Sequence, residues 1–594
     1  MKAWRRIALA ALLVFAVAPI FFHGRSELVS EDSSAYQGLA TSLKAGSYEV
    51  NFKPHIVFPP GFPLALALWG SVFASSNASY LVFVTLLGCA GLIAAWQAQR
   101  IDSGHTVALT ACLLLASSPD YFRLVSRNVF SETLYLLISC LAILCARRLD
   151  SAKKAWPYGL ALAVLTPGVV LIRAVGVAWV AGLFLWLALS TRFNPTAARR
   201  RARSAGPALA LGVLALLGWS DWSFSRQPPP NFEGEPQTYL SVATYRDPHD
   251  TDLGKLALVE LPIRWLDQAA TEGASAVTLL IRPPWISPAF FSVPVAAFFF
   301  LCGLGLVAFV RERGLQAVDC YVVCYFLVLA AWPFEAALRY VMPVLPFCVA
   351  YLWRGICEFN RQRSATRAVQ ALGVFSAVVA AGGLLSLVSG HTLAGKQNLL
   401  SVAIWTVVAV GCWIWPRRHG LPIVPLLPVR VLALAVAGGL VMAGAVEDVA
   451  MARANISESE GSLTGLSELA IAARQIATLS PPSDVVMAEW CYTVNRWSHR
   501  SCVRFPPTRD VRVILEALRK NHVSWLMVKT EPQPSFHFYE PPEGERLRLI
   551  QEAVPGLLRV AQKTAGILIY RLEDAKLSGI PPRSSSTASP PGPP

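Results

Sequence analysis

Hydrophobic and polar positions alternate in long blocks through the first three quarters of the chain. Apolar runs are separated by short polar segments that carry Lys and Arg, which is the pattern of a polytopic α-helical membrane protein. The pattern predicts about thirteen transmembrane helices, at residues 6–22, 79–97, 105–118, 132–145, 157–172, 174–189, 205–219, 285–310, 318–334, 341–353, 369–389, 399–415 and 431–446. Several runs are shorter than the roughly 20 residues that a perpendicular span needs, and the fifth and sixth are compatible with one re-entrant unit.

The distribution of Lys and Arg predicts the orientation of these helices. With the N-terminus in the cytoplasm, the inner segments hold 21 basic residues and the short outer loops hold eight. Cytoplasmic loops carry the excess of positive charge in membrane proteins. We therefore expect an outer loop at 23–78, a second, long outer loop at 220–284, and everything from residue 447 onward on the extracytoplasmic face.

The last quarter of the chain has a different pattern. Helical periodicity at 463–479 and 511–520 alternates with strand-like runs at 485–490, 523–528 and 566–572, which predicts a small extracytoplasmic α/β domain over residues 447–575. Residues 576–594 are rich in Ser and Pro and are expected to be disordered. Residues 1–446 then form the transmembrane catalytic domain.

Composition and charge narrow the functional classes. Of the 594 residues, 54% are hydrophobic and 15% are charged, which argues against an ordinary soluble enzyme. The net charge of +15 would suggest a nucleic-acid partner in a soluble protein, but here the basic residues are topology signals, so we expect no nucleic-acid partner. Ten of the twelve cysteines lie in or beside apolar runs and are interpreted as small hydrophobic residues. Cys491 and Cys502 lie in a polar region, and whether they form a disulfide stays open.

Three segments on the predicted outer face contain ionisable residues that are candidates for catalysis or substrate binding. Glu31 and Asp32, followed by Tyr36, open a predicted amphipathic helix; helix capping by a carboxylate is the alternative explanation for such a pair. Glu132 heads an apolar run, where capping is again the alternative and where an ionisable group is costly. Arg339 stands at the mouth of a predicted span on the face where positive charge is scarce, so it is not explained as a topology signal.

The order of four short motifs resembles a known family, the GT-C integral-membrane glycosyltransferases, which include the protein O-mannosyltransferases and the aminoarabinose transferases of lipid A. The resemblance covers about residues 1–356. The motifs are Asp32-x-x-x-Tyr36, Pro59-Pro60-Gly61-x-Pro63, Ser131-Glu132 and Arg339-Tyr340-x-x-Pro343-x-x-Pro346.

The resemblance implies a sugar donor linked to polyprenyl phosphate and a GT-C fold. It implies that Asp32 is the catalytic carboxylate, which either acts as a base on the acceptor hydroxyl or helps to position it, and Glu31 could share or exchange this role. Arg339 would bind the donor phosphate, because a guanidinium group suits phosphate oxygens. A divalent cation held by Asp32 and Glu132 is left open.

The remaining positions depart from the family pattern or contact the substrate. Phe58 stands where relatives often have Lys before Pro-Pro, which leaves Lys53 as the phosphate-binding candidate or His55 in its place. Tyr36, His55 and Tyr340 are the candidates for substrate binding. Arg173 stands where relatives often carry Arg-Pro, but Ala follows it here, and we assign it no role.

The sequence therefore predicts a glycosyltransferase in the bacterial inner membrane, with its active surface in the periplasm. It would transfer a sugar from a polyprenyl-phosphate carrier to a glycolipid, polysaccharide or protein acceptor. One alternative is a transporter or lipid flippase, which predicts paired ionisable residues near span midpoints and repeated helices; few such residues and no repeat are found. The other is a noncatalytic scaffold of envelope assembly, with the α/β domain as a docking module.

Overall fold

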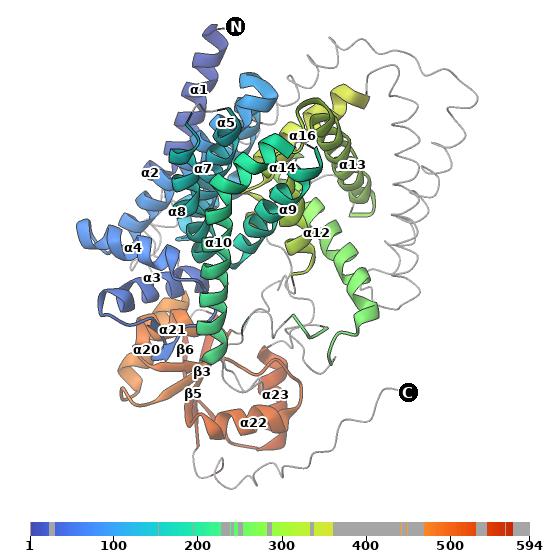
Figure 1. Cartoon of the computed structure of the whole chain (residues 1–594). Coiled ribbons are helices and arrows are strands. Elements are labelled where there is room, and N and C mark those ends of the chain that lie inside the picture. Colours follow the sequence, from blue (N-terminus) through green and yellow to red (C-terminus); the bar gives the residue numbers. More distant parts are fainter. Residues whose placement is uncertain are drawn as a thin grey trace. The chain divides into compact units, whose positions relative to one another are not determined.

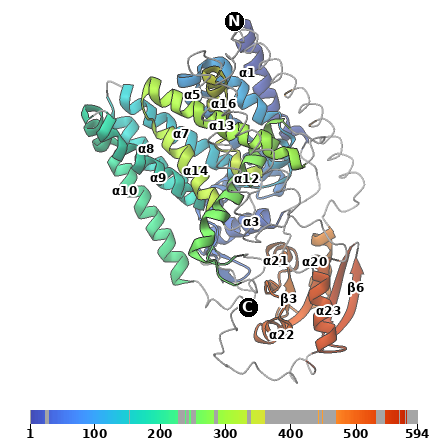
Figure 2. The same ribbon diagram turned by 90° about the vertical axis from the view of Figure 1, so that its right-hand side faces the viewer.

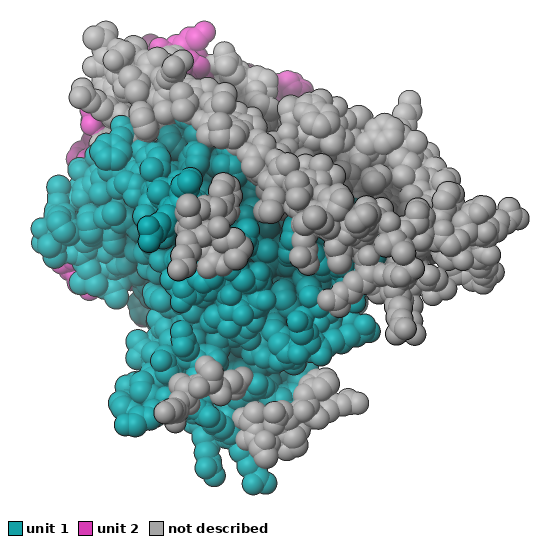
Figure 3. Space-filling model, turned by 90° about the horizontal axis from the view of Figure 1, so that it is seen from above, with its two compact units in different colours: residues 1–26, 58–222, 257–463 teal, residues 27–57, 223–256, 464–594 magenta. Residues whose placement is uncertain are grey.

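The computed structural model of the chain describes residues 2–22, 30–151, 154–193, 195–226, 238, 243–246, 254–281, 288–332, 338–359, 441, 448, 468–529, 543–564, 566–573 and 576. The chain divides into two compact units, coloured separately in Figure 3. Unit 1 comprises Met1–Ser26, Phe58–Trp222 and Ala257–Leu463, and unit 2 comprises Glu27–Val57, Ser223–Leu256 and Thr464–Pro594. The start of the first outer loop therefore folds together with the C-terminal region.

Unit 1 is helical throughout the residues that the structure describes (Figure 1). Its elements are α1 (Lys2–Val17), α2 (Pro19–Phe22), α4 (Gly61–Val72), α5 (Asn77–Ala116), α6 (Pro119–Arg127), α7 (Glu132–Ser151), α8 (Trp156–Ile172), the 3₁₀ turn η1 (Ala174–Gly176), α9 (Val177–Phe193), most of α10 (Pro195–Ser225), η3 (Leu258–Glu260), α12 (Leu261–Ile281), α13 (Pro288–Arg313), α14 (Ala317–Ala330), α15 (Leu338–Val341) and α16 (Leu345–Phe359).

Three described helical segments are long and apolar enough to cross a membrane: Asn77–Ala116, Ala198–Ser225 and Val295–Arg313. The pair Pro119–Arg127 and Glu132–Leu149, bent by 112°, adds a fourth if it is one span. Five shorter apolar helices accompany them, at Arg6–Phe21, Gly61–Val72, Trp156–Ile172, Ala174–Ser190 and Ala317–Ala330. The predicted spans at 369–389, 399–415 and 431–446 lie outside the described residues except for residue 441, so the number thirteen stays a prediction.

One segment agrees with the sequence-based expectation and another departs from it. The predicted spans at 79–97 and 105–118 correspond to the two helical parts of α5, which are separated at Gly104, where φ is 78°; glycine adopts this left-handed conformation without steric cost. The predicted loop at 220–284 contains the end of α10 and the whole of α12, which packs against α13 and α14. Charged residues in α12 lower its hydropathy, so a search for apolar runs passes over this helix.

Buried ion pairs join several helices of unit 1. Arg313 at the end of α13 makes two hydrogen bonds to Asp319 of α14, at 2.9 and 2.8 Å, and the Tyr351 hydroxyl of α16 donates to the same carboxylate at 2.7 Å. Asp102 pairs with Arg147 and, at 3.3 Å, with Arg313. Both oxygens of the Asp319 carboxylate accept hydrogen bonds within unit 1, so the packing of α13, α14 and α16 explains this buried charge.

Unit 2 combines the loop elements α3 (Glu31–Lys44), β1 (Glu49–Val50) and β2 (Lys53–Pro54) with a C-terminal α/β region. The elements of that region are α20 (Glu468–Leu479), β3 (Val485–Ala488), α21 (Cys491–Ser498), β4 (Ser501–Val503), α22 (Val511–Lys520), β5 (Val523–Lys529), α23 (Glu543–Ala553), β6 (Leu558–Thr564) and β7 (Ile567–Leu572). The strands form one sheet in the order β4-β3-β5-β7-β6, in which β4, β3 and β5 are parallel and β7 and β6 are antiparallel.

Figure 2 shows this sheet together with the helices of the C-terminal region. Alternation along the strands places apolar side chains on both faces of the sheet. On one face, Leu526 packs with residues of α22 and α23, and on the other face Trp525 packs with residues of α20 and α21. The predicted helix at 511–520 and the strands predicted at 485–490, 523–528 and 566–572 are confirmed within one to two residues at most ends. The patterns did not reveal β6, because it is an edge strand whose residues are mostly exposed or half-buried.

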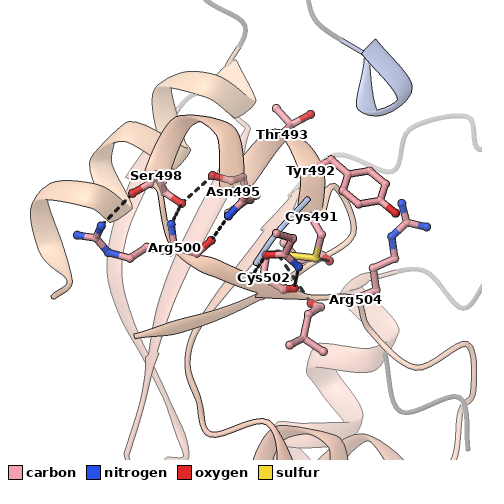
Figure 4. The surroundings of a disulfide bond; sticks show 12 residues. Cys491, Tyr492, Thr493, Asn495, Ser498, Arg500, Cys502 and Arg504 are labelled. Atoms are coloured by element: carbon pink, nitrogen blue, oxygen red, sulfur yellow. Dashed lines mark hydrogen bonds between the residues drawn. A yellow bond between two sulfur atoms is a disulfide. The ribbon is translucent and has the colours of Figure 1, made fainter. Parts of the chain in front are cut away.

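A disulfide joins Cys491, the first residue of α21, to Cys502 in β4 (Figure 4). It links the helix to the edge strand of the sheet over a short stretch of chain. The sequence left this pairing open, and the structure forms it.

Replacement of both cysteines by serine is expected to lower the free energy of unfolding of unit 2 by about 2–5 kcal/mol, because the cross-link restricts the unfolded chain. Denaturant unfolding of the full-length protein, with and without dithiothreitol, measures this loss. The wild type should lose stability on reduction and the double variant should not respond. Equal stability of the oxidised wild type and the double variant would contradict the expectation.

Candidate functional site

In unit 1, two arginines converge on one buried carboxylate. Nη1 of Arg173 lies 2.7 Å from Oε1 of Glu132 and donates to the Ser131 hydroxyl at 3.0 Å. Nε of Arg339 lies 3.5 Å from the same Glu132 oxygen. The Glu132 side chain is 3% exposed, that of Arg173 is 13% exposed and that of Arg339 is 22% exposed. We call Ser131, Glu132, Arg173, Arg339 and Tyr340 the arginine cluster.

Aromatic rings hold the two guanidinium groups of the arginine cluster. Arg339 lies over the Phe130 ring at 4.4 Å and near the Tyr340 ring at 5.1 Å, and Arg173 approaches Tyr340 from 5.3 Å. The Tyr325 hydroxyl of α14 donates to the Tyr340 carbonyl at 2.6 Å and fixes the backbone there. Cation–π contacts orient guanidinium groups without consuming their hydrogen-bond donors.

Each charged residue of the arginine cluster lies where a helix is interrupted. Glu132 opens α7 just after the 112° bend from α6. Arg173 is extended, with φ −150° and ψ 142°, between α8 and η1. Arg339 belongs to the four-residue helix α15 that precedes α16. Such interruptions bring polar groups together at the end of an apolar bundle, where unwound backbone lines functional sites.

The structure brings together three residues that the sequence proposed, Glu132, Arg339 and Tyr340, and adds Arg173, which the sequence left without a role. The signal for Arg173 was visible in its position between two apolar runs.

Glu272 of α12 is a further buried carboxylate, and its position in the sequence does not distinguish it from the other charged residues of that helix. Its side chain is fully buried and has no hydrogen-bond partner among the residues that the structure describes, and burial raises its pKa to about 8.

In unit 2, the Glu31 carboxylate accepts four hydrogen bonds. Oε1 accepts from the Tyr492 amide at 2.8 Å and from Nη2 of Arg504 at 3.2 Å. Oε2 accepts from the amide of Thr493 at 3.0 Å and from its hydroxyl at 3.1 Å. Burial raises the pKa of Glu31, and Arg504 and the two amides partly offset this effect. Ser30 caps α3, so Glu31 caps the distant helix α21 instead of its own.

The other loop candidates lie close by in unit 2. Asp32 is half-buried in the first turn of α3, and Tyr36, one turn further, is 6% exposed. Lys53 is half-buried in β2. His55 is 2% exposed, with its ring edge-on to Tyr48 at 6.1 Å and to Tyr492 at 5.8 Å. The roles of these residues stay predictions.

The neutral state of His55 predicts a pH dependence of stability. Burial, with help from Arg504 and against Asp32, lowers the pKa of His55 to about 3 in the folded protein, below its unfolded value near 6.5. Below pH 6.5 the native state then binds fewer protons than the unfolded state. The stabilising contribution of His55 to the free energy of unfolding is therefore complete above pH 6.5 and is lost as the pH falls toward 3.

We expect the wild type to lose about 2 kcal/mol of unfolding free energy between pH 7 and pH 5 from His55 alone. The His55→Gln variant should lose correspondingly less over the same range. Thermal unfolding of both proteins at the two pH values measures the difference, and identical pH dependence would contradict the assignment.

Comparison with solved structures identifies the fold. ArnT from Cupriavidus metallidurans bound to undecaprenyl phosphate matches with a TM-score of 0.51 and 15% identity, over 96% of this chain and 98% of that chain. The apo state of the same ArnT matches with a TM-score of 0.48 and 15% identity, over 97% and 99% of the two chains. The oligosaccharyltransferase AglB from Archaeoglobus fulgidus, in complex with an inhibitory peptide and a dolichol-phosphate, gives 0.47 and 11% identity over 98% and 75%.

No protein-family model and no curated protein sequence matches the chain. The likeness to ArnT therefore rests on structure, and it extends over nearly the whole of both chains. The chain has the fold of ArnT, a GT-C glycosyltransferase.

Proposed function

We propose that this protein is an integral-membrane glycosyltransferase that takes a sugar from a polyprenyl-phosphate carrier. The observation that carries the proposal is the arginine cluster, in which Arg173 and Arg339 share the buried carboxylate of Glu132 at three helix interruptions. The solved ArnT with this fold is bound to undecaprenyl phosphate. A pair of guanidinium groups in an apolar bundle suits the phosphate group of such a lipid.

Asp32 is the proposed base. Its carboxylate takes the proton of the acceptor hydroxyl as the hydroxyl oxygen forms a bond to the anomeric carbon of the sugar. The bond from that carbon to the phosphate oxygen breaks, and the electron pair leaves with polyprenyl phosphate. Glu31 accepts hydrogen bonds at both oxygens, so we assign it to holding the loop and Asp32 to proton transfer.

The leaving phosphate gains negative charge in this step. Arg339 is the more exposed of the two clustered arginines, with 22% of its side chain accessible, and we propose that it binds the phosphate and stabilises that charge. Arg173, with its contacts to Glu132 and Ser131, orients the carboxylate that in turn positions Arg339. Lys53 is the second proposed phosphate ligand, and Tyr36, His55 and Tyr340 are the proposed substrate contacts.

The proposal includes the predicted topology of thirteen spans, with the catalytic loop and the C-terminal region in the periplasm of a bacterial inner membrane. The Cys491–Cys502 disulfide supports this orientation, because structural disulfides persist in oxidising compartments. A glycolipid, a polysaccharide or a protein would be the acceptor.

A divalent cation held by Asp32 and Glu132 stays a prediction. Among the described residues, no group of three or more His, Cys, Asp or Glu residues could hold a metal ion, and Oε1 of Glu132 lies beside the guanidinium groups of Arg173 and Arg339. The proposed steps use only the side chains named above.

Binding of the carrier tests this function. Native mass spectrometry of the purified full-length protein, offered undecaprenyl phosphate and a tenfold excess of phosphatidylglycerol, should show one retained undecaprenyl phosphate per chain. Equal retention of both lipids would mean that the site does not recognise the polyprenyl phosphate and would count against the proposal.

A further inference from the structure

The loop that carries Asp32 is fastened to the C-terminal α/β region at a first point, the beginning of α21. Glu31, the residue before Asp32, accepts the amides of Tyr492 and Thr493, the second and third residues of that helix. The helix dipole favours a carboxylate at this end. Ser34, one turn further along α3, shares a hydrogen bond of 3.0 Å with the Thr493 hydroxyl. Two successive turns of α3 are therefore held on one helix end.

The loop is fastened at a second point, the edge strand β4. Oδ1 of Asn51 accepts the Cys502 amide at 2.7 Å, and Nδ2 donates to the Cys502 carbonyl. This amide side chain pairs with an edge strand as a neighbouring strand would. Asn51 and Phe52 form the turn between β1 and β2 with φ of 57° and 60°, a left-handed conformation that Asn tolerates and Phe rarely adopts. The contact to β4 holds this turn.

The disulfide joins the two points. Cys491 immediately precedes Tyr492 at the start of α21, and Cys502 is the residue that Asn51 binds. Figure 4 shows the disulfide beside Tyr492 and Arg504, and the Arg504 side chain lies over the Tyr492 ring at 5.3 Å. The start of α21, the edge strand β4 and the disulfide that joins them thus bind the loop at two places, the first turns of α3 and the β1–β2 turn.

We propose that the C-terminal α/β region positions the catalytic loop, with Glu31 and Asn51 as positioning residues and the Cys491–Cys502 disulfide as the brace between their binding points. This inference rests on the proposed function, because it assigns Asp32 to the transfer step. The C-terminal region then has a role in the mechanism, since it fixes the direction of the Asp32 carboxylate without touching the reacting atoms.

Hydrogen exchange in the full-length protein in lipid nanodiscs tests the two anchors without any substrate. Glu31→Gln should raise exchange in α3, Asn51→Ala should raise it in the β1–β2 turn, and the Cys491→Ser/Cys502→Ser variant should raise it in both. The matched control is Glu552→Gln, which removes an exposed carboxylate paired with Arg548 on α23, and it should leave both segments unchanged. Unchanged exchange in α3 of Glu31→Gln would overturn the first anchor.

Steady-state transfer separates positioning from folding. Glu31→Gln should lower kcat by a factor on the order of 10², since a small misplacement of a catalytic group costs about that much, while KM for the donor stays within about twofold. The Asp32→Asn/Glu31→Gln double variant should be no slower than Asp32→Asn alone, because Glu31 acts through Asp32. A further loss in the double variant would overturn the positioning role.

The two proposals fail in different ways. If the wild type transfers no sugar, the proposed function fails and the positioning role falls with it, even where exchange shows that the loop is anchored. If the wild type transfers sugar and Glu31→Gln keeps full kcat, the function stands and the positioning inference is wrong.

Discussion

The Asp32→Asn variant is expected to lose sugar transfer by about 10²- to 10⁴-fold in kcat, the range that a positioned general base contributes. Asparagine keeps the shape of the side chain and one acceptor oxygen, but it replaces the other oxygen by an NH2 donor and cannot accept the proton of the acceptor hydroxyl. Because Asp32 is half-buried in the first turn of α3, the change should leave the fold intact. Transfer of labelled sugar by the purified protein measures the loss.

Two measurements make this result interpretable. The thermal midpoint of Asp32→Asn should equal that of the wild type, which excludes unfolding as the cause. Asp120→Asn, a carboxylate in the first turn of α6 that faces Arg123 at 3.6 Å, should keep full activity. An Asp32→Asn protein that transfers sugar at the wild-type rate would remove Asp32 from the catalytic step.

The Arg339→Gln variant is expected to bind the polyprenyl-phosphate carrier about 10- to 100-fold more weakly, because a hydrogen bond to a charged group contributes about 1.5–3 kcal/mol. Glu132 keeps the ion pair with Arg173 at 2.7 Å in this variant, so its carboxylate is not left alone in the bundle. Titration with undecaprenyl phosphate, followed by native mass spectrometry, measures the dissociation constant.

The matched control for this variant is Arg123→Gln, at a side chain that is 57% exposed. It should bind the carrier as the wild type does. Arg339→Lys should recover only part of the affinity, because an ammonium group lacks the planar pair of donors. If Arg339→Gln binds the carrier normally, the phosphate lies elsewhere and the arginine cluster serves only the packing of unit 1.

Local patterns predicted many of the elements. The helix that opens at Glu31, the strand at 523–528 and the helix at 511–520 follow from periodicity and appear at the expected places. These patterns depend on neighbours within a few residues, so one sequence contains them. Helix α12 did not appear in the prediction because its charged residues lowered its hydropathy.

The partners of the candidate residues could not be predicted. Glu31 binds amides 461 and 462 residues further along the chain, and spacing carries no information at that separation. The capping hypothesis for Glu31 identified the right kind of interaction and missed the helix, because Ser30 already caps α3. Arg173 and Arg339 meet at Glu132 through three separate helix interruptions, which a search along the chain cannot pair.

Transfer of a sugar from a polyprenyl-phosphate carrier to an acceptor is measured by following the carrier. Purified wild type in nanodiscs is offered a panel of undecaprenyl-phosphate sugars and crude envelope acceptors, and the lipid fraction is analysed by mass spectrometry. We predict release of undecaprenyl phosphate from one donor, dependent on the acceptor and absent with Asp32→Asn. Consumption of no donor, under conditions where undecaprenyl phosphate still binds, would contradict the proposed transfer and favour a flippase or a scaffold.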